Sequence, residues 1–438
     1  MEEKGPPRRT TSAGRAKALL PRRPPPRSDA SRRGVPEAKV VELLMTGGYA
    51  HLIAEGQGEE ARGLASEALD RWVSEGLAHE TGPGDGRRFD PAEVVNGLIW
   101  AGLQGRDDFW SERWIATQRR MTRDLATLDP DARALVRVSL VRHFDLAAFP
   151  QGAELLLRAP LPLAGPDHAV ADLVPEVREP VFGPLTIDDG RMTARLRRGP
   201  AVSATLGWTA TLAPCDAPAG PPNLTAAETE LYLRPAEGLI RVSSRVCELA
   251  VLWAGCLSGW EAVVAFWRGM NASFCLGVVA YEEFDAAGAI GWVLDNGWFD
   301  CVLGSALLVS LCRAHGMPSR LVSGHFLYPP IPSIHTWAEA WIDGRGWTPV
   351  DLAGWNLSAG GDDTAWRDVF LGRVDVRMVT ERPPRRVTGP MSVRFPPTWR
   401  ILHRAVDGVL EISTVDAASG RALVTDRLRV QLAPTVLS

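Results

Sequence analysis

The spacing of apolar residues divides the chain into regions, beginning with one of helical character. Over residues 37–128, apolar residues recur three and four positions apart, most clearly from Leu64 to Leu77. Further helices are expected from Pro91 and from Asp107. Residues 1–36 have few large apolar residues and are rich in Pro, Arg and Ser, so we expect a disordered tail, with an anchor for an anionic partner as the alternative.

The next region, residues 129–235, has the alternation of β-strands. Apolar residues recur at every second position from Val136 to Leu140, and Ala201–Leu212 is rich in Thr, Val and Trp. The pair Asp189-Gly190 lies between two apolar runs, which indicates a hairpin turn. We therefore expect a β-rich domain, built as an antiparallel sandwich or sheet.

The remainder of the chain is assigned to a core and a C-terminal segment. Residues 236–300 return to helical spacing and lead into a mixed region, and we place a core domain over 236–385. Two strand-like runs, Leu410–Val415 and Leu423–Leu432, lie in the last segment, residues 386–438. These strands are expected to complete or flank the core, and the whole chain is expected to be α+β.

Charge and composition exclude some classes of function. The 438-residue chain has a net charge of −4, and its hydrophobic fraction of 45% is ordinary for a globular protein. Residues 1–34 hold ten Lys and Arg against three Asp and Glu, which leaves the rest of the chain at −11. Because this body is acidic, nucleic acid is not expected as a partner.

The cysteines and the apolar runs predict a compartment. The six cysteines form no CxxC pair and no metal-ligand spacing with histidine, so we interpret them as reduced thiols. No apolar run approaches the length of a membrane span, and the N-terminus lacks the apolar segment of a signal peptide. We therefore expect a cytoplasmic protein without a membrane partner.

One stretch, Asp300 to Asp351, holds the candidate chemistry. Asp300 is a good N-cap for a helix that ends at Gly316 and Pro318. Cys301 then falls in the first turn, where the positive end of the helix dipole favours the thiolate. Cys301 is therefore a candidate nucleophile, with a buried structural cysteine as the alternative.

The strands after this helix predict a partner for the thiol. Alternation puts His335, Trp337 and Trp341 on one face of a strand, together with Glu339. If Trp341 lies opposite Trp347, then Asp351 lies opposite Trp337 and becomes a diagonal neighbour of His335. We therefore predict that His335 activates Cys301 as a general base and that Asp351 orients His335.

This pattern resembles the core of the transglutaminase-like superfamily, over about fifty residues. Thr336 departs from it, since alanine is frequent at that position. The resemblance implies a transglutaminase-like, papain-like core, in which the catalytic helix packs on an antiparallel sheet. The matching residues are Cys301, Arg313, Gly316, Pro318, Arg320, Gly324, His335, Trp337, Glu339, Gly346, Trp347, Pro349 and Asp351.

Four further residues are weaker candidates for the site. Trp298 and Trp267 could each donate an indole N–H to an oxyanion, although a packing role fits both and the backbone N–H of Cys301 is the better candidate. Trp337 and Glu339 flank His335 and could shape a substrate pocket, with packing equally consistent.

A Cys-His-Asp set predicts a thioacyl-enzyme, and the acceptor decides the reaction. We expect acyl transfer to an amine; hydrolysis by a cysteine protease or amidase is the alternative, and a non-catalytic binding protein is a second one. The flanking sequence, from the GWFDC motif to the segment 366–377, is similar to transglutaminase homologues of natural-product assembly. That resemblance implies a carrier-protein thioester as donor, with a glutaminyl peptide also open. No EF-hand loop occurs, and we predict no metal or cofactor.

Overall fold

The computed structural model describes most of the chain from residue 35 to residue 432. The described ranges are 35–48, 56–74, 135–165, 168–178, 185–214, 223–276, 284–327, 332–352, 377–382 and 399–432, apart from a few positions inside them, with shorter pieces at 52, 78, 80, 86–89 and 371–372. The chain divides into two compact units, each described by itself. The first comprises residues 1–124, 268–300 and 352–366, and the second 125–267, 301–351 and 367–438.

The N-terminal part of the first unit contains two helices, α2 (Glu37–Gly48) and α4 (Gly58–Ser74), beside the short antiparallel pair β1 (Val35–Pro36) and β2 (Arg88–Phe89). Leu44, Leu69 and Trp72 pack in their shared core. The helix predicted over residues 64–77 is confirmed as far as Ser74, although Leu64 itself is exposed, and residues 75–77 lie outside the described residues. The helices expected from Pro91 and Asp107 lie outside the described residues, as do residues 1–34 of the expected disordered tail 1–36. Residues 35–36 of that tail are ordered instead, because they pair with Arg88–Phe89 as strand β1.

The same unit holds a second group of short elements. These are α11 (Ala289–Asn296) and a parallel pair formed by β11 (Cys275–Leu276) and β12 (Trp298–Phe299). Gly297 ends α11 in the left-handed conformation with φ of 74°, which lets the chain turn directly into β12.

The second unit contains the β-rich domain, which is an antiparallel sandwich as predicted. Its larger sheet has the order β17-β18-β19-β3-β8-β5 and its smaller sheet the order β4-β7-β6. Side chains from both sheets meet in one core, which includes Leu140, Trp208 and Met192. The predicted hairpin joins β6 to β7, and Gly190 in its turn has φ of 74°. The strands are β3 (Val136–Asp145), β4 (Glu154–Pro160), β5 (His168–Arg178), β6 (Thr186–Asp188), β7 (Arg191–Arg197) and β8 (Ser203–Pro214).

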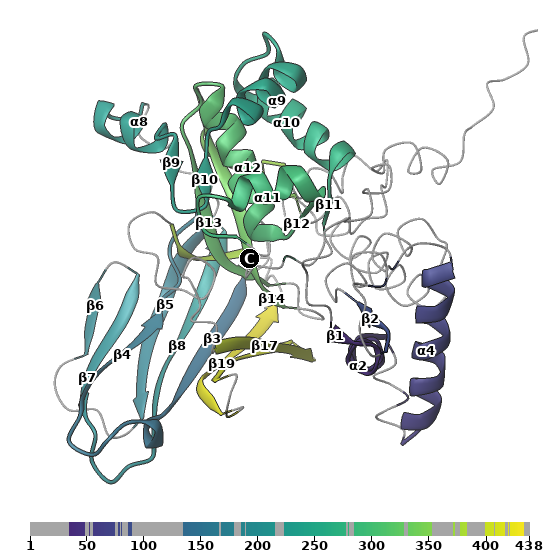
Figure 1. Cartoon of the computed structure of the whole chain (residues 1–438). Coiled ribbons are helices and arrows are strands. Elements are labelled where there is room, and N and C mark those ends of the chain that lie inside the picture. The colour runs from purple at the N-terminus through teal and green to yellow at the C-terminus, as the bar shows by residue number, and fades with distance from the viewer. Residues whose placement is uncertain are drawn as a thin grey trace, which may run out of the picture. The chain divides into compact units, whose positions relative to one another are not determined.

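The C-terminal strands correct one expectation. They were expected to complete or flank the core, but β17 (Trp399–Val406), β18 (Val409–Asp416) and β19 (Ala422–Leu432) extend the larger sandwich sheet (Figure 1). Strand β19 pairs with β3 along its length, and Leu428 and Val430 are buried opposite Leu140 and Val138. This pairing buries one apolar face of the strand in the sandwich, which decides its sheet.

The rest of the second unit is the core domain. Its antiparallel sheet has the order β15-β14-β13-β16, and α12 packs against β13 and β14 (Figure 1). Strand alternation and helix packing are both present, so the α+β class is confirmed. Its elements are α8 (Ala226–Tyr232), β9 (Ala236–Glu237), β10 (Ile240–Arg241), α9 (Ser244–Ala254), α10 (Gly259–Ser273), α12 (Cys301–Ala314), β13 (Ser319–Phe326), β14 (Ser333–Ile342), β15 (Gly346–Val350) and β16 (Arg377–Glu381).

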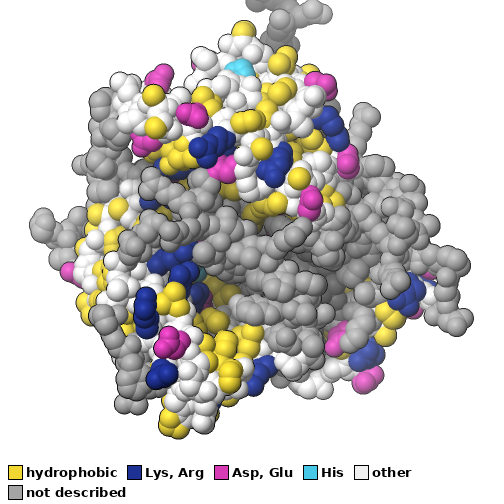
Figure 2. Space-filling model, turned by 60° about the vertical axis from the view of Figure 1, so that its left-hand side comes forward, with side chains coloured by type: hydrophobic (Ala, Val, Ile, Leu, Met, Phe, Trp, Pro, Cys, Tyr) yellow, Lys and Arg dark blue, Asp and Glu magenta, His cyan; other side chains and the backbone are white. Residues whose placement is uncertain are grey.

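The surface of the described residues is chemically mixed. On the face shown in Figure 2, basic and acidic side chains are interspersed with apolar ones. Exposed apolar residues occur on several elements, among them Val174 on β5 and Leu252 on α9. No single described helix has the length and hydropathy of a membrane span; α9 and α10 meet that test only together, as a pair bent by 109°.

Candidate active site

The nucleophile candidate opens the most buried helix of the core. Helix α12 begins at Cys301, directly after Asp300, and every residue from Val302 to Arg313 is buried. Cys301 itself is half-buried and forms no disulfide with another described cysteine. Its place at the helix N-terminus, where unpaired backbone N–H groups and the dipole favour an anion, is the place predicted from the sequence.

Two hydrogen bonds fix how α12 lies along the sheet. The Ser305 hydroxyl donates to the carbonyl of Thr336 at 3.2 Å, and the Ser319 hydroxyl donates to the carbonyl of Val309 at 3.2 Å. Ser319 pairs with Ala340, so Val309 lies near Ala340 and Ser305 lies near Thr336. Moving toward the N-terminus of α12 therefore also means moving toward the first residue of β14. Cys301 lies four residues before Ser305, about 6 Å along the axis and equal to roughly two strand residues. Cys301 is therefore level with the beginning of β14, where His335 lies.

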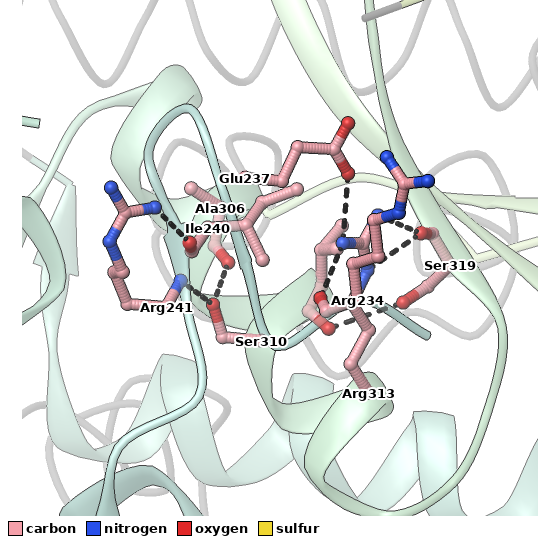
Figure 3. A network of polar contacts seen from close by, with 9 residues as sticks. Arg234, Glu237, Ile240, Arg241, Ala306, Ser310, Arg313 and Ser319 are labelled. Atoms are coloured by element: carbon pink, nitrogen blue, oxygen red, sulfur yellow. Dashed lines mark hydrogen bonds and ion pairs between the residues drawn. The ribbon is translucent and has the colours of Figure 1, made fainter. Parts of the chain in front are cut away.

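The other end of α12 is held by a buried polar network (Figure 3). The Arg313 guanidinium donates to the carbonyl of Ser319 at 3.1 and 2.8 Å, to that of Arg234 at 2.7 Å, and lies 2.9 Å from a Glu237 carboxylate oxygen. Ser310 accepts from the backbone N–H of Arg241 at 3.1 Å. These contacts tie the helix to β13 and to the β9–β10 pair, so the position of its first residue is fixed.

The predicted strand register is present in the structure. Trp341 pairs with Trp347, and the β14–β15 ladder ends at Ala338 and Val350, one position before Asp351. The imidazole Nε2 of His335 then lies 2.6 Å from Asp351 Oδ2, and both residues are more than nine-tenths buried. The predicted hydrogen bond between these two side chains is therefore confirmed.

The β14–β15 ladder ends before it reaches His335. The side chains of Thr336 and Ala340 are on the face of β14 that packs against α12, whereas those of His335 and Trp337 are on the opposite face. Pairing with β15 stops before His335, so the start of β14 extends past β15. Asp351 uses Nε2 of the imidazole, so Nδ1 is the other ring nitrogen of His335.

A glycine opposite His335 lets the next strand come close. Gly324 pairs with His335 on one side and with Val379 of β16 on the other, at an irregularity in the β13–β16 register. A Cβ at this position would lie 1.8 Å from the carbonyl oxygen of Met378. Only glycine therefore fits, and its absence of a side chain brings β16 to the site.

Strand β16 delivers a residue to which the sequence assigned no role. Arg377 donates from Nε at 3.0 Å and from Nη2 at 2.5 Å to Asp351 Oδ2, the same oxygen that faces His335. Its side chain is fully buried and its guanidinium lies 5.6 Å from the ring centroid of Phe326. No spacing rule joins Arg377 to a carboxylate 26 residues earlier, so only the fold reveals this contact.

The weaker candidates take different positions. Trp267 is buried and donates its indole N–H to the backbone carbonyl of Asp351 at 2.7 Å, so that N–H is committed to the protein and not open to an oxyanion. Trp298 lies on β12 in the other compact unit, and its side chain lies outside the described atoms. The Trp337 ring stacks on His335 at 6.1 Å between centroids, and its buried N–H has no partner among the described residues.

Glu339 belongs to a different cluster. It is fully buried and bonds Arg320, with Nε–Oε2 and Nη2–Oε2 distances of 2.8 and 2.7 Å, while that guanidinium lies 3.8 Å from the Trp347 ring centroid. Glu339 follows His335 by four strand residues, about 13 Å. The structure therefore gives Glu339 a packing role in the sheet and places it away from the imidazole.

One other thiol and one other imidazole in the core are kept uncharged by burial. Burial raises the pKa of the Cys312 thiol to about 12, so this cysteine stays protonated. Burial lowers the pKa of His325 to about 4, so this histidine stays neutral. Among the described residues, no three His, Cys, Asp or Glu side chains are grouped so as to hold a metal ion.

Comparisons with known proteins cover the same region. The family model described as Transglutaminase-like superfamily matches residues 262–352. A solved structure classed with the cysteine proteases, from Cytophaga hutchinsonii, is similar at 14% identity over 70% of this chain and 93% of its own, with a TM-score of 0.44. The periplasmic domain of TgpA from Pseudomonas aeruginosa is similar at 18% identity over 54% of this chain and 94% of its own, with a TM-score of 0.31. No curated protein sequence matches the chain.

Proposed function

Because residues 262–352 match the transglutaminase-like superfamily, we propose that this protein is a thiol-dependent acyltransferase that forms a thioacyl-enzyme on Cys301 and passes the acyl group to an amine. The observation that carries this proposal is the buried His335–Asp351 pair, level with the helix N-terminus that presents Cys301.

Each residue has a defined step. Asp351 accepts the Nε2–H of His335, which leaves the Nδ1 lone pair to take the thiol proton of Cys301. The thiolate attacks the acyl carbonyl, and the leaving group departs with that proton from His335. An amine then attacks the thioester, gives its proton to His335, and the Cys301 sulfur leaves as the thiolate. Backbone N–H groups at the start of α12 are the donors available to the oxyanion.

The surroundings of His335 support an amine as acceptor. His335 is 7% exposed, and the rings of Phe326 and Trp337 lie within 6.1 Å of its ring centroid. An apolar wall of this kind excludes water and favours a neutral amine over an ammonium ion. These are the two conditions under which aminolysis competes with hydrolysis.

The acyl donor is proposed from the sequence around the site. The similarity of the segments near Cys301 and from residue 366 to residue 377 to transglutaminase homologues of natural-product assembly supports a thioester on a carrier protein. A glutaminyl side chain in a peptide is the competing donor, because its amide would release ammonia in the same first step.

Intact-mass spectrometry tests the proposal with candidate donors of both classes. The protein and its Cys301→Ala variant are mixed with a panel of acyl thioesters and glutaminyl peptides, with and without a primary amine. We expect an acyl adduct on the wild-type chain alone, and its conversion by the amine into an amide.

Two results would change the conclusion. An adduct that clears at the same rate with and without amine would identify a hydrolase, which is the cysteine protease or amidase alternative. Equal labelling of wild type and Cys301→Ala by every donor would remove Cys301 from the chemistry and overturn the proposal.

A further inference from the structure

The side chains of His335 and Arg377 contact the same carboxylate oxygen of Asp351. His335 Nε2 approaches Oδ2 at 2.6 Å, and Arg377 places both Nε and Nη2 on this same oxygen at 3.0 and 2.5 Å. Trp267 fixes the Asp351 backbone from behind through its carbonyl. The two contacts to the carboxylate come from β14 and β16, and the contact to the backbone carbonyl comes from α10.

The charge on this carboxylate requires such support. Asp351 is 2% exposed and Arg377 is also 2% exposed. A carboxylate removed from water is costly unless it is paired, and a guanidinium is the one side-chain cation that stays charged at every accessible pH. Since Cys301 needs an imidazole that faces a charged carboxylate, the cation matters for the chemistry as well as for the fold.

We infer that Arg377 is a fourth, positioning member of the site: it holds the Asp351 carboxylate in its charged form and turned toward His335. This inference rests on the proposed function, because it concerns how His335 activates Cys301. In this role Arg377 acts through Asp351.

The β-sandwich in turn holds the strand that delivers Arg377. Leu163, in the segment after β4, donates its backbone N–H to the Val379 carbonyl of β16 at 2.8 Å. Arg191 of β7 lies 3.1 Å from Glu381 at the end of β16. The sandwich therefore contributes to the site by fixing the strand on which Arg377 lies.

The test is the pH profile of Cys301 alkylation by iodoacetamide, followed by peptide mapping, which requires no substrate. Cys247 and Cys256 are exposed free thiols in the same chain and serve as internal references. Removing a buried cation raises the pKa of neighbouring groups by about 1–3 units. We therefore expect Arg377→Met to move the acid limb of Cys301 alkylation upward by at least about 1 pH unit, and Arg377→Lys to recover most of that shift.

The matched control is Arg313→Met, which removes an equally buried arginine twelve residues along α12, about 18 Å from Cys301. It should lower the melting temperature without moving the limb. The role of Arg377 is overturned if folded Arg377→Met keeps the wild-type acid limb of Cys301 alkylation, or if Arg313→Met shifts that limb by the same amount. If Cys301 of the wild-type protein had the same alkylation pH profile as Cys247 and Cys256, its thiol would not be activated, and both proposals would be overturned.

Discussion

Gly324→Ala is the substitution for which the structure gives the most direct magnitude. The added Cβ would lie 1.8 Å from the Met378 carbonyl oxygen, 2.9 Å from its carbon and 3.1 Å from Val379 Cα. Real Cβ atoms essentially never come closer than 3.0 Å, so β16 must retreat by at least the remaining 1.2 Å. All three obstructing atoms are backbone, so no side-chain rotation can relieve the overlap.

The retreat has a chemical consequence, because Arg377 is on the same strand. A displacement of this size lengthens donor distances of 2.5 and 3.0 Å beyond hydrogen-bond range. A misplacement of about 1 Å costs roughly 100-fold in rate, and overpacking costs about 1–3 kcal/mol in stability. We expect both effects in Gly324→Ala, measured by Cys301 alkylation and by urea unfolding.

The control is Gly207→Ala in the sandwich, where a Cβ would lie 2.9 Å from the Leu140 carbonyl oxygen. It should lower the free energy of unfolding and leave the alkylation rate of Cys301 unchanged. If Gly324→Ala kept the wild-type stability and the wild-type alkylation rate, the close approach of β16, and the argument built on it, would be refuted.

Three other substitutions probe the site and the sheet beside it. Asp351→Asn should lower kcat by about 10²–10⁴-fold without abolishing it, because orientation is lost while the thiol and base remain; a rate equal to wild type in the thioester assay would contradict this. Trp267→Phe removes the hydrogen bond from the indole N–H to the buried Asp351 carbonyl and should cost about 1–3 kcal/mol in unfolding free energy, with kcat falling more than KM rises; unchanged unfolding and kinetics would refute that role. Burial lowers the pKa of His325 from 6.5 to about 4. As pH falls, the unfolded chain therefore binds a proton at this histidine before the folded chain does, and the free energy of unfolding decreases between pH 6.5 and about 4, by roughly 3 kcal/mol in all. His325→Gln should weaken this acid dependence in urea unfolding at pH 7 and pH 4.5, and an identical dependence in both proteins would count against it.

Much of the candidate site could be predicted from the sequence because its signals are local. The helix that begins at Cys301 follows from a capping residue and apolar spacing; α12 begins there and ends at Ala314, two residues before the left-handed Gly316. The His335–Asp351 contact follows from strand alternation and a tight turn, since one pair, Trp341 with Trp347, sets every other pair in the ladder. These features need only neighbouring residues, so the chain determines them without its tertiary structure.

The tertiary structure decided which distant segments meet. The C-terminal strands are recognisable as strands from their own residues, but their partner β3 lies nearly 300 positions away in the sequence, and the burial of Leu428 against the sandwich core placed them there. Arg377 and Trp267 reach Asp351 from other elements, and neither spacing nor alternation connects them. Local sequence determines whether a segment is a helix or a strand. Which segments it packs against depends on the arrangement that buries the most apolar surface and pairs every buried charge, and this arrangement is a property of the whole fold.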